Sequence, residues 1–595
     1  MLVTVRALIA ALISAVGVAA AVVAPAPAPA AASGRPVAMF EEDVHLLADP
    51  ARTLATLRQL GAGVVRLSVA WNSIAPAAFS ANPPRGFNAS DPAAYPAGSW
   101  APYDAVVREA QAFGITLDLS LTGPPPRWAT GPGKPRHGGY PAWEPSASQY
   151  GKFVQAIGTR YSGQYQGLPR VRWWELWNEP NFGPDLTPQA IKGSTISVAP
   201  MVYRGLVDAA WQALRASGHA SDTIILGNLD ARGQSGRPSR YAPDGLPGNF
   251  GATKPMQFIR TLYCVDASYR QLRGRAAAVV GCPPSPAGSR RFRAVHPGLF
   301  QAPGFADHPY PVNLPPTQAS STDPDFVEFN ELPRFAAALD RLQRIYGSGH
   351  RFAIYNNEYG YITNPPNRSA VSRFVSPPTA AYYINWAEYL TWRNPRIAST
   401  MQFLLYDPNP FKAPEYGGFA SGLLFYGGKP KASVDAYRLP VFLPVTTARR
   451  GHSLELWGDA RPAHFYDDYT VQVQFQRGSR GRFRTIRTVR AGNPLGYFDT
   501  RIVFPASGSV RLAWSYPAGP AAGTPGSGAG SSTGANAGSS TGGNAGSSTG
   551  GNAGSSTGGN PGSSTGGTGS PVTSYIKPPP PPYTVYSRTT NVTVR

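Results

Sequence analysis

The chain has 595 residues, and its 54 Lys and Arg against 33 Asp and Glu give a net charge of +21. A chain of this length can bury more than one hydrophobic core, so we expect one large and one small domain. The charge could attract acidic polymers, but no basic run is interleaved with base-stacking aromatic residues, so we expect a diffusely positive surface and no nucleic-acid partner.

The N-terminal region has the pattern of a secretory signal peptide. Arg6 precedes an apolar stretch over 7–23, and Ala30, Ala31 and Ala32 are small residues that a signal peptidase accepts. We assign residues 1–32 to this peptide and expect a secreted, extracellular protein, with association with the cell wall or membrane left open. An uncleaved anchor is the alternative, because the apolar stretch nearly reaches the ~20 residues that span a bilayer.

Residues 33–440 alternate between short apolar runs and stretches of helical period, as repeated βα units do. The expected strands are 37–40, 64–70, 115–121, 171–177, 223–227, 304–308, 352–356 and 400–405. The expected helices are 51–60, 103–113, 150–161, 201–216, 256–263, 334–346 and 380–392. This pattern predicts an α/β fold, a (β/α)8 TIM barrel with long loops. An open doubly wound sheet is the alternative, but no strand runs into a glycine-rich phosphate turn.

The pattern changes after the barrel. Residues 441–517 alternate with a spacing of two, which predicts an all-β, immunoglobulin-like sandwich. Residues 518–582 contain copies of Gly-Ser-Ser-Thr-Gly-Gly-Asn-Ala and then a proline run, so we expect a disordered segment that buries no core. Residues 583–595 alternate valine with threonine, and they are either the final strand of the sandwich or a tail.

The chain has only two cysteines, Cys264 and Cys282. In an oxidising compartment two cysteines this close in sequence favour a disulfide that closes a local loop. No histidine cluster lies beside them, so we expect no metal site there.

The clearest chemical signal is the run WWELWNEPN over residues 173–181. Pro180 must end ladder hydrogen bonding, so Glu179 lies at the carboxyl end of a strand, the face of a barrel that carries active sites. Glu175 precedes Glu179 by four residues, so on a strand its side chain points to the same face but lies about 13 Å deeper in the barrel. We interpret Glu175 as a buried structural carboxylate that needs a partner such as Arg66.

This run resembles the motif of the clan A glycoside hydrolases, the superfamily of many cellulases and β-xylosidases, in which the fourth strand ends in Asn-Glu. The resemblance implies that Glu179 is the catalytic acid/base and that Asn178 hydrogen-bonds the sugar 2-hydroxyl. A retaining mechanism needs a second carboxylate about 5–5.5 Å away. Glu358 ends the expected seventh strand, in the run FAIYNNEYGY over 352–361, and is the candidate nucleophile.

The resemblance also implies supporting residues. Arg66 resembles the second-strand arginine that keeps the nucleophile ionised, and His308 with Tyr310 resembles the sixth-strand pair that orients it. Trp71 and Trp128, like Trp177, lie near strand ends, where they either stack on a sugar ring or pack in the core. Two departures put the substrate in doubt: the eighth strand lacks the usual tryptophan, and the third lacks a histidine at its end.

The sequence therefore predicts a retaining O-glycoside hydrolase (EC 3.2.1.-) that cleaves β-linked oligo- or polysaccharides with two glutamates. We expect a monomer with a carbohydrate substrate and no cofactor or metal. The alternative is a non-catalytic carbohydrate-binding or cell-wall-associated barrel, whose signature would be the loss of one glutamate. A transglycosylase with the same residues also stays open.

Overall fold

The computed structural model describes residues 36–133, 142–191, 194–240, 242–243, 245–366, 374–410, 419–517 and 583–595. The expected signal peptide and the repeat over 518–582 lie outside these residues. None of the helices in the described part of the chain combines the length and the apolar character needed to cross a membrane.

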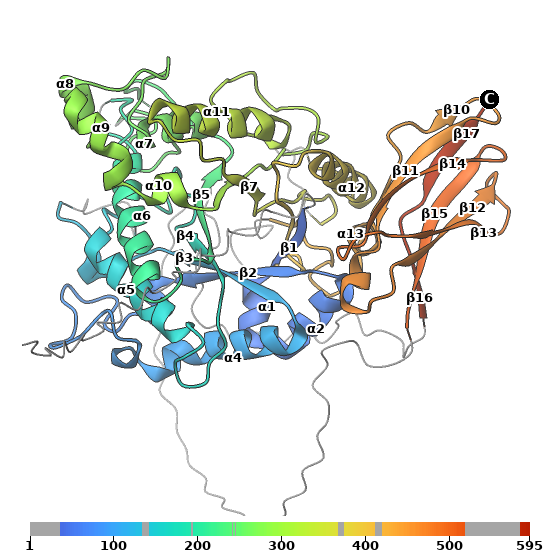
Figure 1. Ribbon diagram of the computed structural model, residues 1–595, viewed down its shortest axis with the longest axis horizontal. Coiled ribbons are helices and arrows are strands. Elements are labelled where there is room, and N and C mark those ends of the chain that lie inside the picture. The colour runs from blue at the N-terminus through green and yellow to red at the C-terminus, as the bar shows by residue number, and fades with distance from the viewer. Residues whose placement is uncertain are drawn as a thin grey trace, which may run out of the picture.

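Eight parallel strands form the centre of the large domain (Figure 1). They are β1 (Val37–Glu41), β2 (Val64–Ala70), β3 (Thr116–Thr122), β4 (Trp173–Leu176), β5 (Thr223–Asp230), β6 (Gly304–His308), β7 (Ala353–Asn356) and β8 (Ser399–Phe403). Each strand from β1 to β6 pairs with the next, and β8 pairs with β1. Backbone bonds from Ala398 N to Ile354 O (2.7 Å) and from Ile354 N to Arg396 O (2.9 Å) join β7 to the start of β8. The sheet is thus closed, and the predicted (β/α)8 barrel is confirmed.

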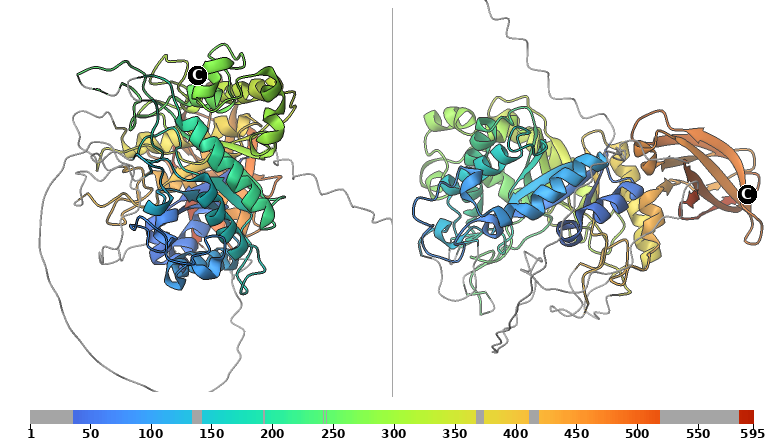
Figure 2. Two further views of the ribbon diagram at one scale, coloured as in Figure 1. Left: turned by 90° about the vertical axis from the view of Figure 1, so that its left-hand side faces the viewer. Right: turned by 90° about the horizontal axis from the view of Figure 1, so that it is seen from below.

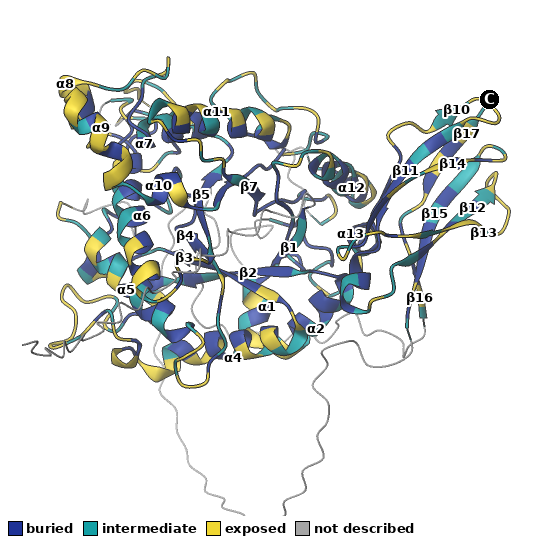
Figure 3. Ribbon diagram, viewed as in Figure 1, coloured by how far each residue is buried: buried dark blue, intermediate teal, exposed yellow. Residues whose placement is uncertain are grey.

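Helices surround this sheet, with their exposed faces turned outward (Figures 2 and 3). They are α1 (Asp43–Ala48), α2 (Pro50–Leu60), α3 (Trp71–Ile74), α4 (Ala97–Phe113), α5 (Ala147–Arg160), α6 (Ala199–Ala216), α7 (Pro255–Leu262), α8 (Gly274–Val279), α9 (Pro286–Val295), α10 (Gly298–Gln301), α11 (Leu332–Ile345), α12 (Pro377–Arg393) and α13 (Ser433–Arg438). Side chains cap several of them; Ser146, for example, accepts from Gln149 N at the start of α5. All seven expected helices are present.

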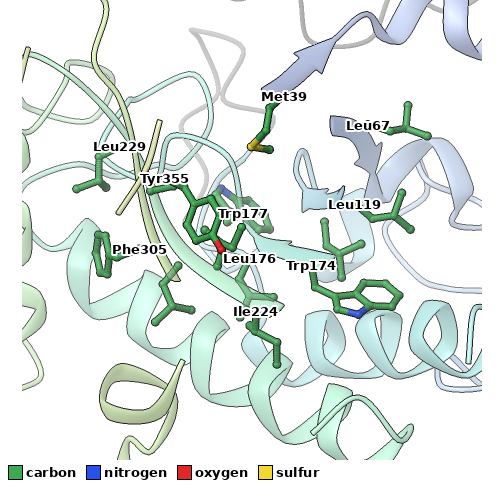
Figure 4. Packing of buried hydrophobic residues seen from close by; sticks show 14 of the residues in the cluster. Met39, Leu67, Leu119, Trp174, Leu176, Trp177, Ile224, Leu229, Phe305 and Tyr355 are labelled. Carbon is green, nitrogen blue, oxygen red and sulfur yellow. The ribbon is translucent and has the colours of Figure 1, made fainter. Parts of the chain in front are cut away.

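The barrel core is continuous from strands to helices. Figure 4 shows Leu119, Trp174 and Phe305 among the packed side chains, and each of them is at most 1% exposed. Burying large apolar side chains of this kind contributes about 1.5–3 kcal/mol each. This packing fixes the positions of the strand ends that carry the site.

An insertion of three short helices, α8 to α10, lies between α7 and β6, and the sequence pattern did not indicate them. Cys264 and Cys282 form a disulfide in this region, as expected. Because 18 residues separate them along the chain, the bond closes a local loop.

The C-terminal domain consists of two β-sheets, mainly antiparallel, as predicted. Its strands are β9 (Val441–Phe442), β10 (Thr447–Ala448), β11 (Ser453–Asp459), β12 (Thr470–Arg477), β13 (Arg484–Arg490), β14 (Tyr497–Val503), β15 (Gly508–Tyr516), β16 (Tyr583–Tyr586) and β17 (Thr590–Val594). One sheet has the order β10-β17-β15-β12-β13 with β16 also on β15, and the other has the order β14-β11-β9. The last residues are therefore strands: Tyr583 pairs with Tyr516, and Val592 pairs with Gly508.

The sandwich packs on helices of the barrel, on the side of α12 and α13 (Figure 1). Tyr389 of α12 contacts the rings of Phe442 and Trp457, and its hydroxyl donates to Glu455 Oε1 at 2.8 Å. Arg461 forms a buried ion pair with Glu388 of α12. These contacts fix the sandwich against the outside of the barrel.

Candidate active site

Glu179 and Glu358 meet at the carboxyl ends of the barrel strands. Glu179 follows β4 by three residues, Glu358 follows β7 by two, and the residues are 6% and 4% exposed. One carboxylate oxygen of each lies within 4.8 Å of the other and of a ring nitrogen of His308. The fold thus brings together residues that are far apart in the sequence.

The backbone around Glu179 adopts an uncommon conformation. Trp177 and Glu179 have positive φ values, +71° and +36°, which cost on the order of 1–3 kcal/mol each outside glycine. Asn228, at an irregularity in β5, compensates: its carbonyl accepts from Glu179 N (2.9 Å) and its amide donates to Trp177 O (2.7 Å). The same side chain accepts from Asn357 Nδ2 at 2.6 Å. Asn228 therefore ties the two chain segments that carry the glutamates to each other.

Arg66 of β2 is the centre of the buried polar network, and it is 0% exposed. Its guanidinium donates to Glu175 Oε2 (2.7 Å), Glu41 Oε2 (2.5 Å) and Glu358 Oε1 (2.8 Å). It also donates to Asn178 Oδ1 at 2.8 Å. The expected pairing of Arg66 with Glu175 is therefore present, and Arg66 also contacts the candidate nucleophile directly.

Glu175 and Glu358 respond differently to this charge. Burial raises the pKa of Glu175, but Arg66 and the hydrogen bonds from Asp118 and Asn357 outweigh it, so its pKa lies below the ordinary value. Burial raises the pKa of Glu358 above its ordinary value, and His308 and Arg66 oppose that effect. Tyr310 donates its hydroxyl to Glu358 Oε2 at 3.0 Å, which further favours the ionised carboxylate.

The pKa of Glu179 is also raised. Burial raises its pKa from 4.5 to about 7, and the distant charge of Arg66 only partly opposes this. The carboxyl of Asp185 hydrogen-bonds to Glu179, and its own pKa is raised well above the ordinary value by burial and by the charge of Glu179. Burial thus favours the protonated form of Glu179 up to about neutral pH, and the hydrogen bond from Asp185 opposes that effect.

His308 lies between the two glutamates. Its Nδ1 is 2.9 Å from Glu179 Oε1 and 3.4 Å from Glu358 Oε2, so it lies nearer the candidate acid/base than the nucleophile that it was expected to orient. Burial lowers the pKa of His308 to about 4, so the ring is neutral at neutral pH. The expectation for Tyr310 is met, because its hydroxyl contacts Glu358.

The remaining candidates are distributed as follows. Asn178 is within the network, between Arg66 and Asp185. Trp71 is 0% exposed and stacks on Phe153, so the core-packing alternative applies and the proposed stacking on a sugar ring is wrong for this residue. Trp128 is half-buried and donates its indole N–H to Pro76 O at 3.1 Å; its contact with a sugar stays a prediction.

Sequence reasoning missed Asp185, Glu41 and the Asn228–Asn357 pair. Glu41 ends β1 and shares its register with Arg66, so strand pairing could have indicated it. Asp185 lies in the loop after β4, where no periodic pattern places a side chain.

Glu179, His308 and Glu358 have the residue types of a metal site. However, Arg66 contacts Glu358 at 2.8 Å, and its positive charge would repel a cation there. The donor set therefore fits a pair of catalytic carboxyls better than it fits a metal.

A comparison of the sequence with protein-family models and with curated proteins found no match. Among solved structures, the chain is similar to a family 39 glycoside hydrolase from Bacteroides cellulosilyticus WH2, with a TM-score of 0.43 and 13% identity over 79% of this chain and 81% of that one. It is also similar to a family 1 β-glucosidase from Thermotoga maritima (TM-score 0.37, 13% identity, 64% and 81% covered). An exo-β-1,4-mannosidase from Opitutaceae bacterium strain TAV5 gives a TM-score of 0.37 at 14% identity, with 69% and 60% covered. These structural neighbours are glycoside hydrolases of the class that the sequence resembles. Because their TM-scores are low, the function proposed below is argued from the geometry of the site.

Proposed function

We propose that this chain is a retaining O-glycoside hydrolase acting on β-linked oligo- or polysaccharides, with Glu358 as nucleophile and Glu179 as acid/base. The observation that carries the proposal is the short separation of the two carboxyls, within 4.8 Å between one oxygen of each. Retaining enzymes hold their carboxyls about 5–5.5 Å apart, whereas inverting enzymes need about 6.5–9.5 Å for an intervening water.

In the first step, the Glu358 carboxylate attacks the anomeric carbon while Glu179 donates its proton to the leaving glycosidic oxygen. Arg66 and Tyr310 hold Glu358 in position through one oxygen each. The raised pKa of Glu179, about 7, supplies the proton near neutral pH. A glycosyl-enzyme forms and the aglycone leaves.

In the second step, Glu179, now ionised, accepts a proton from water as the water attacks the anomeric carbon. The bond to Glu358 breaks, and the sugar leaves with retained configuration. In the tautomer protonated at Nδ1, the neutral His308 would donate to the ionised Glu179, 2.9 Å away, and stabilise it in this half of the cycle. A sugar hydroxyl in place of water would give transglycosylation.

Secretion, a monomeric state and contact with the cell wall stay part of this proposal. Secretion rests on the sequence pattern of residues 1–32, and contact with the cell wall rests on the net charge of +21.

The test is hydrolysis of a panel of aryl β-glycosides and soluble polysaccharides by wild type, Glu179→Ala and Glu358→Ala, with and without azide. Loss of the acid/base should lower kcat roughly 10²–10⁴-fold, and loss of the nucleophile should lower it by on the order of 10⁴-fold or more. Azide should rescue Glu179→Ala with a β-glycosyl azide and Glu358→Ala with an α-glycosyl azide. Glu109→Ala, on the outer helix α4, is the matched control and should keep full activity.

Activity that survives Glu358→Ala would show that another residue is the nucleophile. No hydrolysis across the panel, together with measurable glycan binding, would instead support the non-catalytic barrel.

A further inference from the structure

The basic residues of the sandwich are all arginines: residues 441–517 and 583–595 contain no lysine. They are also unevenly distributed, because the hairpin of β12 and β13 collects six of them. We call this set the arginine edge, and it consists of Arg477, Arg480, Arg482, Arg484, Arg487 and Arg490. No acidic residue occurs between Asp468 and Asp499 to balance it.

All six side chains are exposed. Among the residues that the structure describes, no carboxylate pairs with any of them. Arg487 donates instead to the backbone carbonyl of Arg501 at 3.0 Å, and the exposed Arg501 guanidinium donates to Ser453. Like charges gathered without counter-charges repel one another, so a bound polyanion would stabilise this arrangement.

β13 is the last strand of its sheet, so its arginines lie at a sheet edge, and the turn between β12 and β13 lies at the end of the sandwich away from the barrel (Figure 1). Arg484, Arg487 and Arg490 recur every three residues, about 10 Å apart along a strand. The set therefore extends over about 20 Å of strand, more than a single small anion would occupy. It borders both faces of the edge, since Arg484 and Arg487 pair with Phe475 and Val473, whereas Arg490 pairs with Thr470. A guanidinium also matches a planar carboxylate through two parallel hydrogen bonds, which an ammonium does not.

The sheet face beside this edge favours a polysaccharide. Gln472 and Gln474 point outward from β12, and such amides can hydrogen-bond hydroxyl groups. The aromatic rings near them are already covered: Arg511 lies 4.0 Å from the ring centre of Phe483 and 3.7 Å from that of Tyr586. One face of each ring is therefore occupied by Arg511 and is not open to a nucleic-acid base.

We propose that the arginine edge binds an anionic polysaccharide through its uronate carboxylates. The bound polymer would anchor the molecule while the carboxyl-end site of the barrel stays open, because the edge lies on a different domain from Glu179 and Glu358. The proposal does not depend on the catalytic activity of that site.

The test compares the intact protein with Arg482→Gln/Arg484→Gln/Arg490→Gln in affinity electrophoresis through gels that contain polygalacturonate. The matched control removes the same charge from exposed helix positions of the barrel, with Arg290→Gln/Arg291→Gln/Arg344→Gln. We expect the edge variant to weaken binding about tenfold and the control to change it less than about twofold. Binding should weaken as salt is raised, and a neutral glucan should not retard the protein.

Equal losses in both variants would overturn the proposal, since net charge alone would then explain binding. So would tighter binding of double-stranded DNA or polyphosphate than of polygalacturonate. Exposed arginines also prevent edge-to-edge association of strands. If the edge variant self-associates in analytical ultracentrifugation while its affinity for polygalacturonate is unchanged, that protective role replaces the proposed one.

Discussion

The carboxyl end of the barrel and the arginine edge of the sandwich differ in how their charged side chains are placed: buried and paired in the first, exposed in the second. At the barrel end, one buried arginine, Arg66, pairs with three carboxylates, and burial raises the pKa of Glu179 and Asp185 beside them. At the arginine edge, six exposed arginines face water without carboxylate partners in the described structure. The protein is strongly basic overall, yet the chemistry we propose for it lies in an acidic interior.

The comparison shows that burial decides what an arginine does. A buried guanidinium fixes its neighbours and sets their pKa values, because the penalty for leaving any partner unpaired is large. An exposed one contributes little to folding and stays free for a ligand. The following substitutions test this contrast.

The largest difference is expected between Arg66→Gln and Arg484→Gln, which remove the same group from the two regions. Arg66→Gln leaves Glu41, Glu175 and Glu358 without their cation and should lower the free energy of unfolding by about 3–5 kcal/mol. Arg484→Gln should change it by less than about 0.5 kcal/mol. Urea denaturation measures both, and equal shifts would contradict the contrast.

The contrast between buried and exposed sites can be repeated within β17. Val592 is 2% exposed in the sandwich core, whereas its neighbour Thr593 points to solvent. Val592→Asp should cost about 3 kcal/mol, because it buries a group that has no partner there. Thr593→Asp should cost less than about 0.5 kcal/mol. If both variants melt like wild type, the final strands do not contribute to the stability of the sandwich.

The pH dependence of activity and of stability tests the protonation of Glu179 in the acidic interior. Glu179 must be protonated to act as an acid, and its pKa is raised to about 7, so kcat/KM should fall about tenfold per pH unit well above that value. Native Glu179 also binds more protons than the unfolded chain between its ordinary value of 4.5 and about 7. Its contribution to stability should therefore decrease as pH rises through that window.

Glu179→Gln provides the control for this prediction, because it removes the titrating group but keeps the shape. The fall in melting temperature between pH 5 and pH 8 should become smaller in this variant. An unchanged slope would assign the proton to other buried carboxyls, such as Asp230, whose pKa burial also raises to about 7.

Much of the barrel could be predicted because βα periodicity is local. β2 and β6 have the predicted bounds. β4 was predicted too long, because the chain leaves the ladder through the positive φ of Trp177, which composition does not reveal. α4 begins six residues earlier than expected, and Pro102 lies within the helix.

The site was predictable where a motif or a strand end marked it, as at Glu179 and Glu358. The residues that tune it were less visible. Asp185 lies in a loop, and Asn228 acts through a strand irregularity, so only the folded arrangement shows that both touch the acid/base segment. Trp71 was instead predicted as a sugar-binding residue from its position near a strand end, which does not reveal that its ring is buried in the core.

The pairing of Tyr516 with Tyr583 places the two ends of the segment over 518–582 side by side. The segment therefore leaves and re-enters the sandwich at one point, and β16 and β17 belong to the fold although they lie far along the chain. A protease cut within the segment would give two polypeptides that migrate separately under denaturing conditions and together under native ones. The junction is consequently a natural position at which a foreign domain could be inserted without dividing the sandwich.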